Sequence, residues 1–219
     1  MSERIFGTDG IRGRAGTGWL SAAGAARVGQ AVGAVLGAGS RGRALLGHDG
    51  RASGPELEAA VASGLCAHGF STDSAGLLPT PGIAWLALER DYDAAVMISA
   101  SHNPAEDNGI KVFGARGQKL SDEQELAIEA RLGASAAAVA PGALAVDAAL
   151  ERAYEDHLVA SSGGLDLAGM RVAFDGANGA GSRVGPRVLA RLGATVDALC
   201  CAPDGTNINA HCGAVHPEQ

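Results

Sequence analysis

Apolar and polar positions along the chain change period repeatedly, which predicts strands and helices in alternation. Apolar residues at helical spacing over Val28–Leu36 indicate a helix, and Gly37 and Gly39 stand where it would end. Ala44–Gly47 is a short apolar strand candidate. The unbroken apolar run within Asp93–Ser99 is typical of a strand that is covered on both faces.

Two further helices are indicated by their first residues. Ser53 stands three residues before Glu56, and Ser121 stands three residues before Gln124, which is the spacing of a capping box. We therefore expect a helix to begin at each serine. The expected ends are at Gly69 and Gly133.

The last third of the chain predicts one strand–helix–strand unit. Gly133–Val146 is rich in Ala, Gly and Pro and is interpreted as a connection. A helix is expected over Ala148–Ala160, followed by a strand over Met170–Asp175. A glycine-rich loop, a helix over Arg183–Leu192 and a strand over Ala194–Cys201 complete the unit.

These elements predict an α/β protein with mixed sheets flanked by helices. We expect two domains, residues 1–140 and residues 147–219. The sequence ends soon after the last strand of the strand–helix–strand unit. A sheet with so few strands is small for an independent domain. The expectation is therefore a shortened form of a longer protein.

Charge and composition narrow the functional classes. The formal net charge is −7 without a basic block, which argues against binding to nucleic acid or to anionic membranes. No apolar run reaches the length of a membrane span, and the first ten residues lack the apolar core of a signal peptide. A cytoplasmic protein is expected.

The four cysteines form no C-x-x-C pair. Cys200 and Cys201 lie in an apolar run and are expected to point to opposite faces of a strand. With Cys66 and Cys212, they are interpreted as reduced structural thiols, since a zinc site calls for better ligand spacing.

Ser99–Pro104 is the strongest local signal for chemistry. It follows the buried run directly, and ligands in open α/β sheets bind at the carboxyl ends of strands. The segment would present the hydroxyl of Ser101 and the imidazole of His102 on a tight loop, with Asn108-Gly109 as a second turn signal. An ordinary polar turn is the alternative, because Ser-His-Asn-Pro is common turn composition.

Serine needs an activating base or an electrophile to react. A hydrolase would favour G-x-S-x-G, which this chain lacks, so a serine hydrolase is a distant alternative. Phosphoryl transfer instead calls for cations around the phosphate. Four basic residues could supply these cations if the fold brings them near Ser101: Arg12, Arg14, Lys111 and Lys119. The alternative for each is a solvated surface charge.

Glycine-rich segments supply further candidates. Phe6–Gly13 would let the backbone approach a ligand closely. Gly47–Arg51 is equally consistent with a site loop or a plain turn containing an Asp–Arg pair. Asp175–Gly181 follows a strand and opens a helix, but it lacks the P-loop lysine, so a structural turn is favoured over an anion site. Gly37–Gly42 precedes a strand, the wrong order for a dinucleotide fingerprint.

Taken together, these segments resemble the α-D-phosphohexomutase family, and most closely its members that act on glucosamine phosphates. The matching segments run in family order through nearly the whole chain. They are FGTDGIRG at Phe6–Gly13, GHDGRASG at Gly47–Gly54, LPTPG at Leu78–Gly82, MISASHNP at Met97–Pro104, DNGIKVF at Asp107–Phe113, DGANGA at Asp175–Ala180 and PDGTNIN at Pro203–Asn209.

The resemblance implies an isomerase of amino-sugar metabolism that interconverts glucosamine 6-phosphate and glucosamine 1-phosphate and supplies cell-wall precursors. Ser101 would be the phosphoserine, and a bound 1,6-bisphosphate would be the intermediate. Lys111 and Arg12 would lie near the reacting phosphate, with the lysine as acid or base, and His102 would shape the site.

The resemblance also implies substrate contacts from Thr8, Asp9 and Asn103. Mg²⁺ would bind an oxygen of the Ser101 phosphate, together with aspartates of an Asp-Gly-Asp-Gly-Asp loop expected beyond residue 219.

The chain departs from the family pattern at two positions and in length. His48 stands where a basic residue is usual, and Gly50 stands where Thr is usual. Family members are about twice as long, so we expect the isolated chain to be inactive. Two alternatives remain open: a phosphomannomutase/phosphoglucomutase, and a fragment that binds a sugar phosphate or a partner without turnover.

Overall fold

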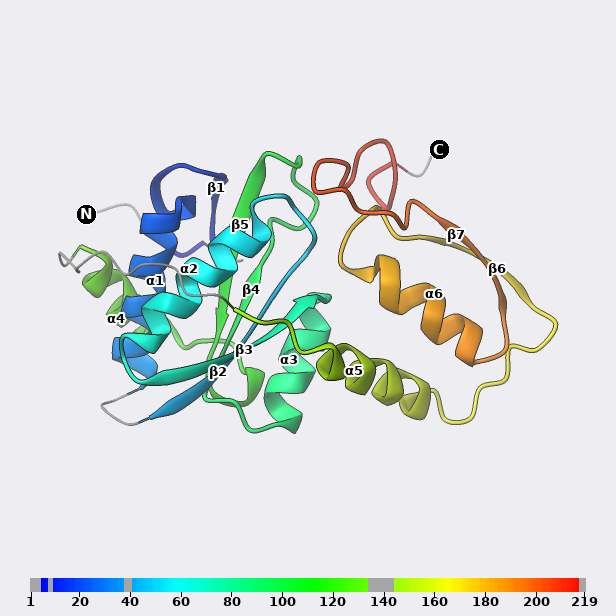
Figure 1. Cartoon of the computed structure of the whole chain (residues 1–219), viewed down its shortest axis with the longest axis horizontal. Helices are drawn as coiled ribbons and strands as arrows, with labels where there is room; N and C mark the ends of the chain where they lie inside the picture. Colours follow the sequence, from blue (N-terminus) through cyan, green and yellow to red (C-terminus); the bar gives the residue numbers. More distant parts are fainter. Residues whose placement is uncertain (1–4, 8–9, 38–40, 134–143, 217–219) are drawn as a thin grey trace.

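The computed structural model describes residues 5–7, 10–37, 41–133 and 144–216. Its larger part is a five-stranded mixed sheet in the order β1-β5-β4-β2-β3 (Figure 1). β2 pairs in parallel with β3 and β4, whereas β5 pairs antiparallel with β4 and β1. The strands are β1 (Ile11–Arg14), β2 (Gly42–His48), β3 (Phe70–Leu77), β4 (Ala94–Ile98) and β5 (Asp107–Phe113).

Helices cover both faces of this sheet. The helices are α1 (Ala22–Leu36), α2 (Gly54–Cys66), α3 (Thr80–Glu89), α4 (Asp122–Leu132) and α5 (Ala148–Ser161), with short 3₁₀ turns at Gly18–Leu20 and Ala115–Gly117. Neighbouring strand residues belong to different cores: Leu46 and Val96 pack in one cluster, Leu45 and Met97 in the other. The apolar runs are therefore strands buried on both faces.

Two glycines allow α1 and α2 to pack closely. A Cβ atom on Gly29 would lie 2.2 Å from the carbonyl oxygen of Val61, and one on Gly64 would lie 2.2 Å from that of Ala26. Such separations are far inside van der Waals contact, so larger residues at these positions would push the helices apart. Close helix packing thus explains part of the high glycine content.

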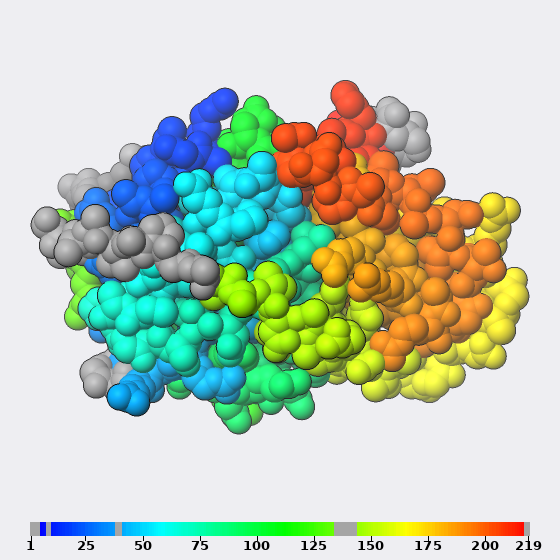
Figure 2. Space-filling view, viewed as in Figure 1, coloured from blue at the N-terminus to red at the C-terminus, as the bar shows by residue number. Residues whose placement is uncertain are grey.

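The rest of the chain forms a smaller unit. The parallel strands β6 (Arg171–Asp175) and β7 (Thr195–Leu199) are joined by α6 (Gly181–Arg191), which confirms the predicted strand–helix–strand unit. Tyr154 of α5 and Val184 of α6 share a core cluster with residues of the large sheet. Figure 2 shows the orange and red surface of the C-terminal residues lying against the cyan surface around α2.

The fold class expected from the sequence is confirmed, and most expected elements are present within a few residues. The pattern did not predict β1, β3, α3 or β5. The proposed domain boundary at residue 140 lies outside the described residues, and the two-domain division stays a prediction. Among the residues that the structure describes, no helix is long and apolar enough to cross a membrane.

Three local predictions are wrong. Ser53 makes no side-chain cap on α2, because its hydroxyl accepts a hydrogen bond from Asn108 at 2.8 Å. Asn108 and Gly109 do not form a turn; they lie inside β5, where Gly109 pairs with Arg12. Cys200 does not continue a strand, since β7 ends at Leu199 and Cys200 has φ +47°. The capping box of Ser121 is confirmed.

A buried carboxyl group predicts how stability depends on pH. Glu58 of α2 is 3% exposed, accepts a 2.6 Å hydrogen bond from Ser74 and lies 4.0 Å from the His48 ring nitrogen. Burial raises its pKa from 4.5 to about 7. The unfolded chain therefore releases this proton at lower pH than the folded chain, and Glu58 lowers stability as pH rises from 4.5 to 7.

We expect Glu58 to lower the free energy of unfolding of the wild type by up to roughly 3 kcal/mol between pH 4.5 and pH 7. Glu58→Gln should not show this decrease, because glutamine keeps the hydrogen bond without the charge. Urea unfolding at pH 5 and pH 7 measures the change. Glu56→Gln, at an exposed position of the same helix, is the control. Burial lowers the pKa of His48, so this histidine has the opposite effect. The stability that comes from its neutral form is lost as pH falls below 6.5. Equal pH dependence in wild type and Glu58→Gln would contradict the prediction.

Candidate active site

The loop that follows β4 holds Ser101 in a strained conformation. Its φ of +58° lies in the left-handed region, which costs a residue other than glycine about 1–3 kcal/mol. The backbone N–H of Ser101 donates to the hydroxyl of Ser99 at 3.0 Å. The serine side chain is exposed at the carboxyl end of a buried strand, which supports the site loop over an ordinary turn.

A buried ion pair lies beneath this loop. Arg51 is 1% exposed, Asp49 is 4% exposed, and their side chains meet at 3.0 Å. The same oxygen of Asp49 accepts a 2.6 Å hydrogen bond from the hydroxyl of Ser99. The Asp49 carboxylate therefore holds the arginine and, through Ser99, the backbone of Ser101.

Arg51 ties the loop together through main-chain carbonyl groups. Its guanidinium donates to Ser101 and Asn103 at 3.0 Å each, to Asp107 at 3.0 Å, and to Pro104. A guanidinium has five N–H donors in a rigid plane, and lysine could not reproduce this geometry. The sequence was equally consistent with a plain turn and with a site loop at this Asp–Arg pair. The contacts of Arg51 favour the site loop, because they support the Ser101 loop.

The C-terminal region fastens the same loop from the other side. The amide of Asn209 donates to the carbonyl oxygen of Ser101 at 3.0 Å and to that of Asn103 at 3.3 Å. Asn103 itself donates to Asp107 at 3.0 Å and accepts from Arg12 at 3.5 Å. The loop is therefore held by contacts from both parts of the chain.

Two of the candidate cations share one face of the sheet at this edge. Arg12 of β1 pairs with Gly109 of β5, and Lys111 lies two residues further along β5. Cross-strand partners and residues two apart point to the same face. Lys111 also pairs with Met97, which lines the cavity beside Ser101.

Of the other predicted site residues, some lie near Ser101 and others do not. The ring of His102 lies 3.5 Å from the Ser101 hydroxyl oxygen. Arg14 lies two residues beyond Arg12 and pairs with Asp107. Lys119 bridges to Phe113 at the far end of β5 and is not brought to the site. The predicted substrate contacts Thr8 and Asp9 lie outside the described residues.

A cavity of about 360 Å³ lies between the Ser101 loop and the smaller unit. Its wall includes Ser99, Ser101 and His102 on one side and Ile208 and Asn209 on the other. The start of α3 also lines it through Pro79–Pro81, and the two residues that lead into α6 line it through Gly179–Ala180. Helix N-termini carry a partial positive charge that favours an anion, so the cavity suits a phosphate group.

The described residues do not form a magnesium site at Ser101. Mg²⁺ is bound by oxygen ligands, usually carboxylates. Within the described ranges, the one group of three metal-ligating side chains with ligand atoms within 4.8 Å of one another is Asp175, Cys200 and Cys212, and two of these are thiols. The magnesium prediction therefore depends on carboxylates outside the described residues.

Sequence reasoning missed several residues that build the site. Asn209 lies in a recognised motif, but nothing in its spacing indicated a contact 108 residues away. The N-terminus of α3 was missed with its helix, although the Pro-Thr-Pro run at Pro79–Pro81 is a signal for a helix start.

The fold is that of an α/β protein, and its candidate site is a cavity beside a strained serine. Residues 3–138 match the family described as phosphoglucomutase/phosphomannomutase, alpha/beta/alpha domain I. This match covers more than half of the chain, which therefore belongs to the phosphoglucomutase/phosphomannomutase family.

Curated relatives are similar over nearly the whole chain. The chain is 47% identical to phosphoglucosamine mutases of Moorella thermoacetica and Deinococcus deserti, with 98% and 99% of this chain covered and 50% of each relative. The chain thus spans about half the length of the curated relatives it matches. The predicted resemblance to the phosphohexomutases is confirmed.

The chain is also similar to solved structures of phosphohexomutases. The chain superposes on a putative phosphomannomutase from Thermus thermophilus with a TM-score of 0.79 at 26% identity, covering 94% of this chain and 48% of that one. A phosphoglucomutase/phosphomannomutase family protein from Burkholderia thailandensis gives a TM-score of 0.74 at 29% identity, covering 94% of this chain and 46% of that one.

Removing Arg51 should destabilise the chain strongly. We expect Arg51→Met to cost about 3–5 kcal/mol, because it leaves Asp49 buried without its partner and removes donors from four carbonyl groups. Urea unfolding measures the loss. Arg171→Met is the matched control: Arg171 meets Asp197 at 2.6 Å, but its side chain is 76% exposed, so we expect a much smaller loss of stability than for Arg51→Met. Similar losses in the two variants would refute the role of Arg51.

Proposed function

We propose that this chain carries the phosphoserine half of a phosphoglucosamine mutase, in which Ser101 exchanges a phosphoryl group with glucosamine phosphates. The observation that carries the proposal is the strained Ser101 at a cavity lined by two helix N-termini, with Arg12 and Lys111 on the adjoining sheet face. The names of the similar proteins support glucosamine phosphate as the substrate.

In the proposed reaction, the bond between phosphorus and the Ser101 oxygen breaks while a bond forms to the 1-hydroxyl oxygen of glucosamine 6-phosphate. The ammonium of Lys111 gives a proton to the departing Ser101 oxygen and takes up the proton of the 1-hydroxyl, so the lysine stays charged and a 1,6-bisphosphate results. After the bisphosphate turns over, the Ser101 oxygen attacks the 6-phosphorus, and the proton of the Ser101 hydroxyl passes through Lys111 to the departing 6-oxygen. Glucosamine 1-phosphate is released and the phosphoserine is restored.

The surroundings of Ser101 favour phosphoryl transfer over a hydrolase mechanism. Phosphoryl transfer is catalysed mainly by positioning and by charge stabilisation. Arg51 and Asn209 supply positioning through the loop backbone. The cations and helix N-termini supply positive potential where charge accumulates. We infer that Mg²⁺ also contributes charge neutralisation, with its carboxylate ligands outside the described residues.

Phosphate on Ser101 is the direct test. We expect incubation with a hexose 1,6-bisphosphate and Mg²⁺ to add one phosphate-sized increment to the intact mass, located on Ser101 by peptide fragmentation. Ser101→Ala should abolish it, and Ser71→Ala, at an exposed position on β3, should not. If neither this chain nor a version extended past residue 219 gains phosphate on Ser101, the proposal fails.

The roles of the two cations are tested by the rate of that transfer. We expect Lys111→Met to slow phosphate loading by about 10²–10⁴-fold and Arg12→Met by about 10²-fold, because each removes a charge at the developing anion. Lys111→Arg should retain part of the rate. Lys119 bridges to Phe113 at the far end of β5, so Lys119→Met should leave the rate unchanged, and an equal loss in that variant would contradict the assignment.

A second candidate function is sugar-phosphate binding without turnover. It is favoured by the lack of a carboxylate cluster beside Ser101 within the described residues. Calorimetry with glucosamine 6-phosphate, combined with a coupled assay for glucosamine 1-phosphate, separates the two functions. Binding without product would favour this second candidate, and faster turnover of mannose or glucose phosphates would favour the related phosphomannomutase/phosphoglucomutase activity.

A further inference from the structure

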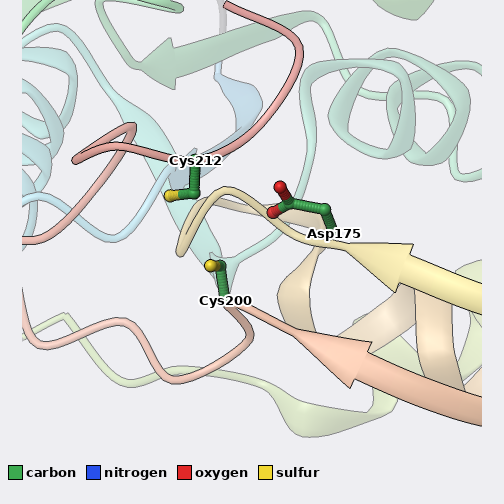
Figure 3. A group of neighbouring side chains, drawn as sticks. All are labelled: Asp175, Cys200 and Cys212. Atoms are coloured by element: carbon green, nitrogen blue, oxygen red, sulfur yellow. The ribbon is translucent and has the colours of Figure 1, made fainter. Parts of the chain in front are cut away.

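A group of metal-ligating side chains has no part in the proposed phosphoryl transfer, although Ala177 and Ala214, two residues from two of its members, line the Ser101 cavity. It consists of Asp175, Cys200 and Cys212, whose ligand atoms all lie within 4.8 Å of one another. Asp175 ends β6, Cys200 follows β7 directly, and Cys212 lies in the C-terminal loop (Figure 3). Three separate segments therefore converge on one point.

We propose that Asp175, Cys200 and Cys212 form a zinc-binding site that ties the loop of residues 201–216 to the β6–β7 sheet. Two thiolates and one carboxylate are a donor set that zinc accepts, whereas Mg²⁺ and Ca²⁺ prefer oxygen ligands alone. Three protein ligands leave a fourth tetrahedral position for water, as in open zinc sites.

The spacing of the ligands fits this ion. Zinc–sulfur and zinc–oxygen bonds of about 2.3 and 2.0 Å place tetrahedral ligand atoms about 3.5–3.8 Å apart. Ligand atoms within 4.8 Å of one another reach that geometry with side-chain shifts of about 1 Å. Cys212 is 1% exposed, whereas Cys200 is exposed and provides a path for the ion to enter.

Neighbouring groups hold the ligands in place. The two oxygens of Asp175 accept hydrogen bonds from the backbone N–H groups of Ala177 at 2.8 Å and Gly213 at 2.7 Å. The amide nitrogen of the Asn178 side chain lies 3.8 Å from the Cys212 sulfur as a donor. Metal sites commonly orient their ligands through such contacts.

Gly213 allows the loop to approach the sheet this closely. It has φ +77°, and a Cβ atom there would lie 2.6 Å from the side chain of Ala177. The loop that passes through Cys212 also carries Ile208, Asn209 and Val215, which line the cavity beside Ser101. A bound zinc would therefore fix one wall of that cavity.

The test is zinc binding by the full chain after reduction and removal of bound metals. We expect one zinc per chain by native mass spectrometry, and a rise in melting temperature that increases with zinc concentration. Co²⁺ should give the thiolate charge-transfer and visible bands of a tetrahedral site. Binding should strengthen as pH rises, because zinc displaces the thiol protons.

Cys200→Ser, Cys212→Ser and Asp175→Asn should each weaken zinc binding by about tenfold or more. The exposed Cys200 gives a variant that keeps the buried core intact. Cys201→Ser and Cys66→Ser are the matched controls and should bind zinc as the wild type does, since neither thiol belongs to the group.

Three outcomes would overturn the proposal. The reduced chain could bind no zinc at micromolar concentrations, Cys201→Ser could lose as much affinity as Cys200→Ser, or the purified protein could carry a Cys200–Cys212 disulfide in place of the metal. None of these outcomes concerns phosphate on Ser101, so the zinc site and the proposed mutase activity fail independently.

Discussion

The buried pair of Asp49 and Arg51 is the constraint on which the candidate site depends. Burying an ion pair is costly unless each remaining donor and acceptor finds a partner. Here the guanidinium donates to three carbonyl groups of the loop after β4 and to that of Asp107 at the start of β5, and the carboxylate accepts from Ser99. The loop satisfies the pair, and the pair in turn holds Ser101 in a conformation that the serine alone would avoid.

This dependence follows from the sheet topology. β2 and β4 are parallel neighbours, so the segments that follow them, with Arg51 on one and Ser101 on the other, emerge at the same edge. β5 returns antiparallel and brings Lys111 back along the same sheet, with Arg12 added by β1. Rigid strands thus set the positions of the cations, and one buried arginine sets the loop between them.

Sequence patterns predicted the elements whose burial is uniform and missed those whose burial depends on distant partners. The apolar run of β4 was recognised because every residue in it is buried. β5 was missed because Asn108 and Gly109 have the composition of a turn; Asn108 instead bonds to Ser53, and Gly109 leaves space for Ser99 and Arg12. The family motifs identified Ser101, Arg12 and Lys111, but not the contact from Asn209, which only the tertiary structure creates.

The two parts of the chain contribute different kinds of positive potential around the Ser101 loop. The large sheet places full charges, Arg12 and Lys111, on fixed strands. The N-terminus of α6, from the smaller unit, adds a helix dipole together with that of α3. A full charge binds one phosphate tightly, whereas a dipole attracts anions without a strong geometric demand. A ligand carrying two phosphates could therefore be held firmly beside Ser101 and loosely at its other end, which is the asymmetry that an intermediate needs if it is to turn over within one site.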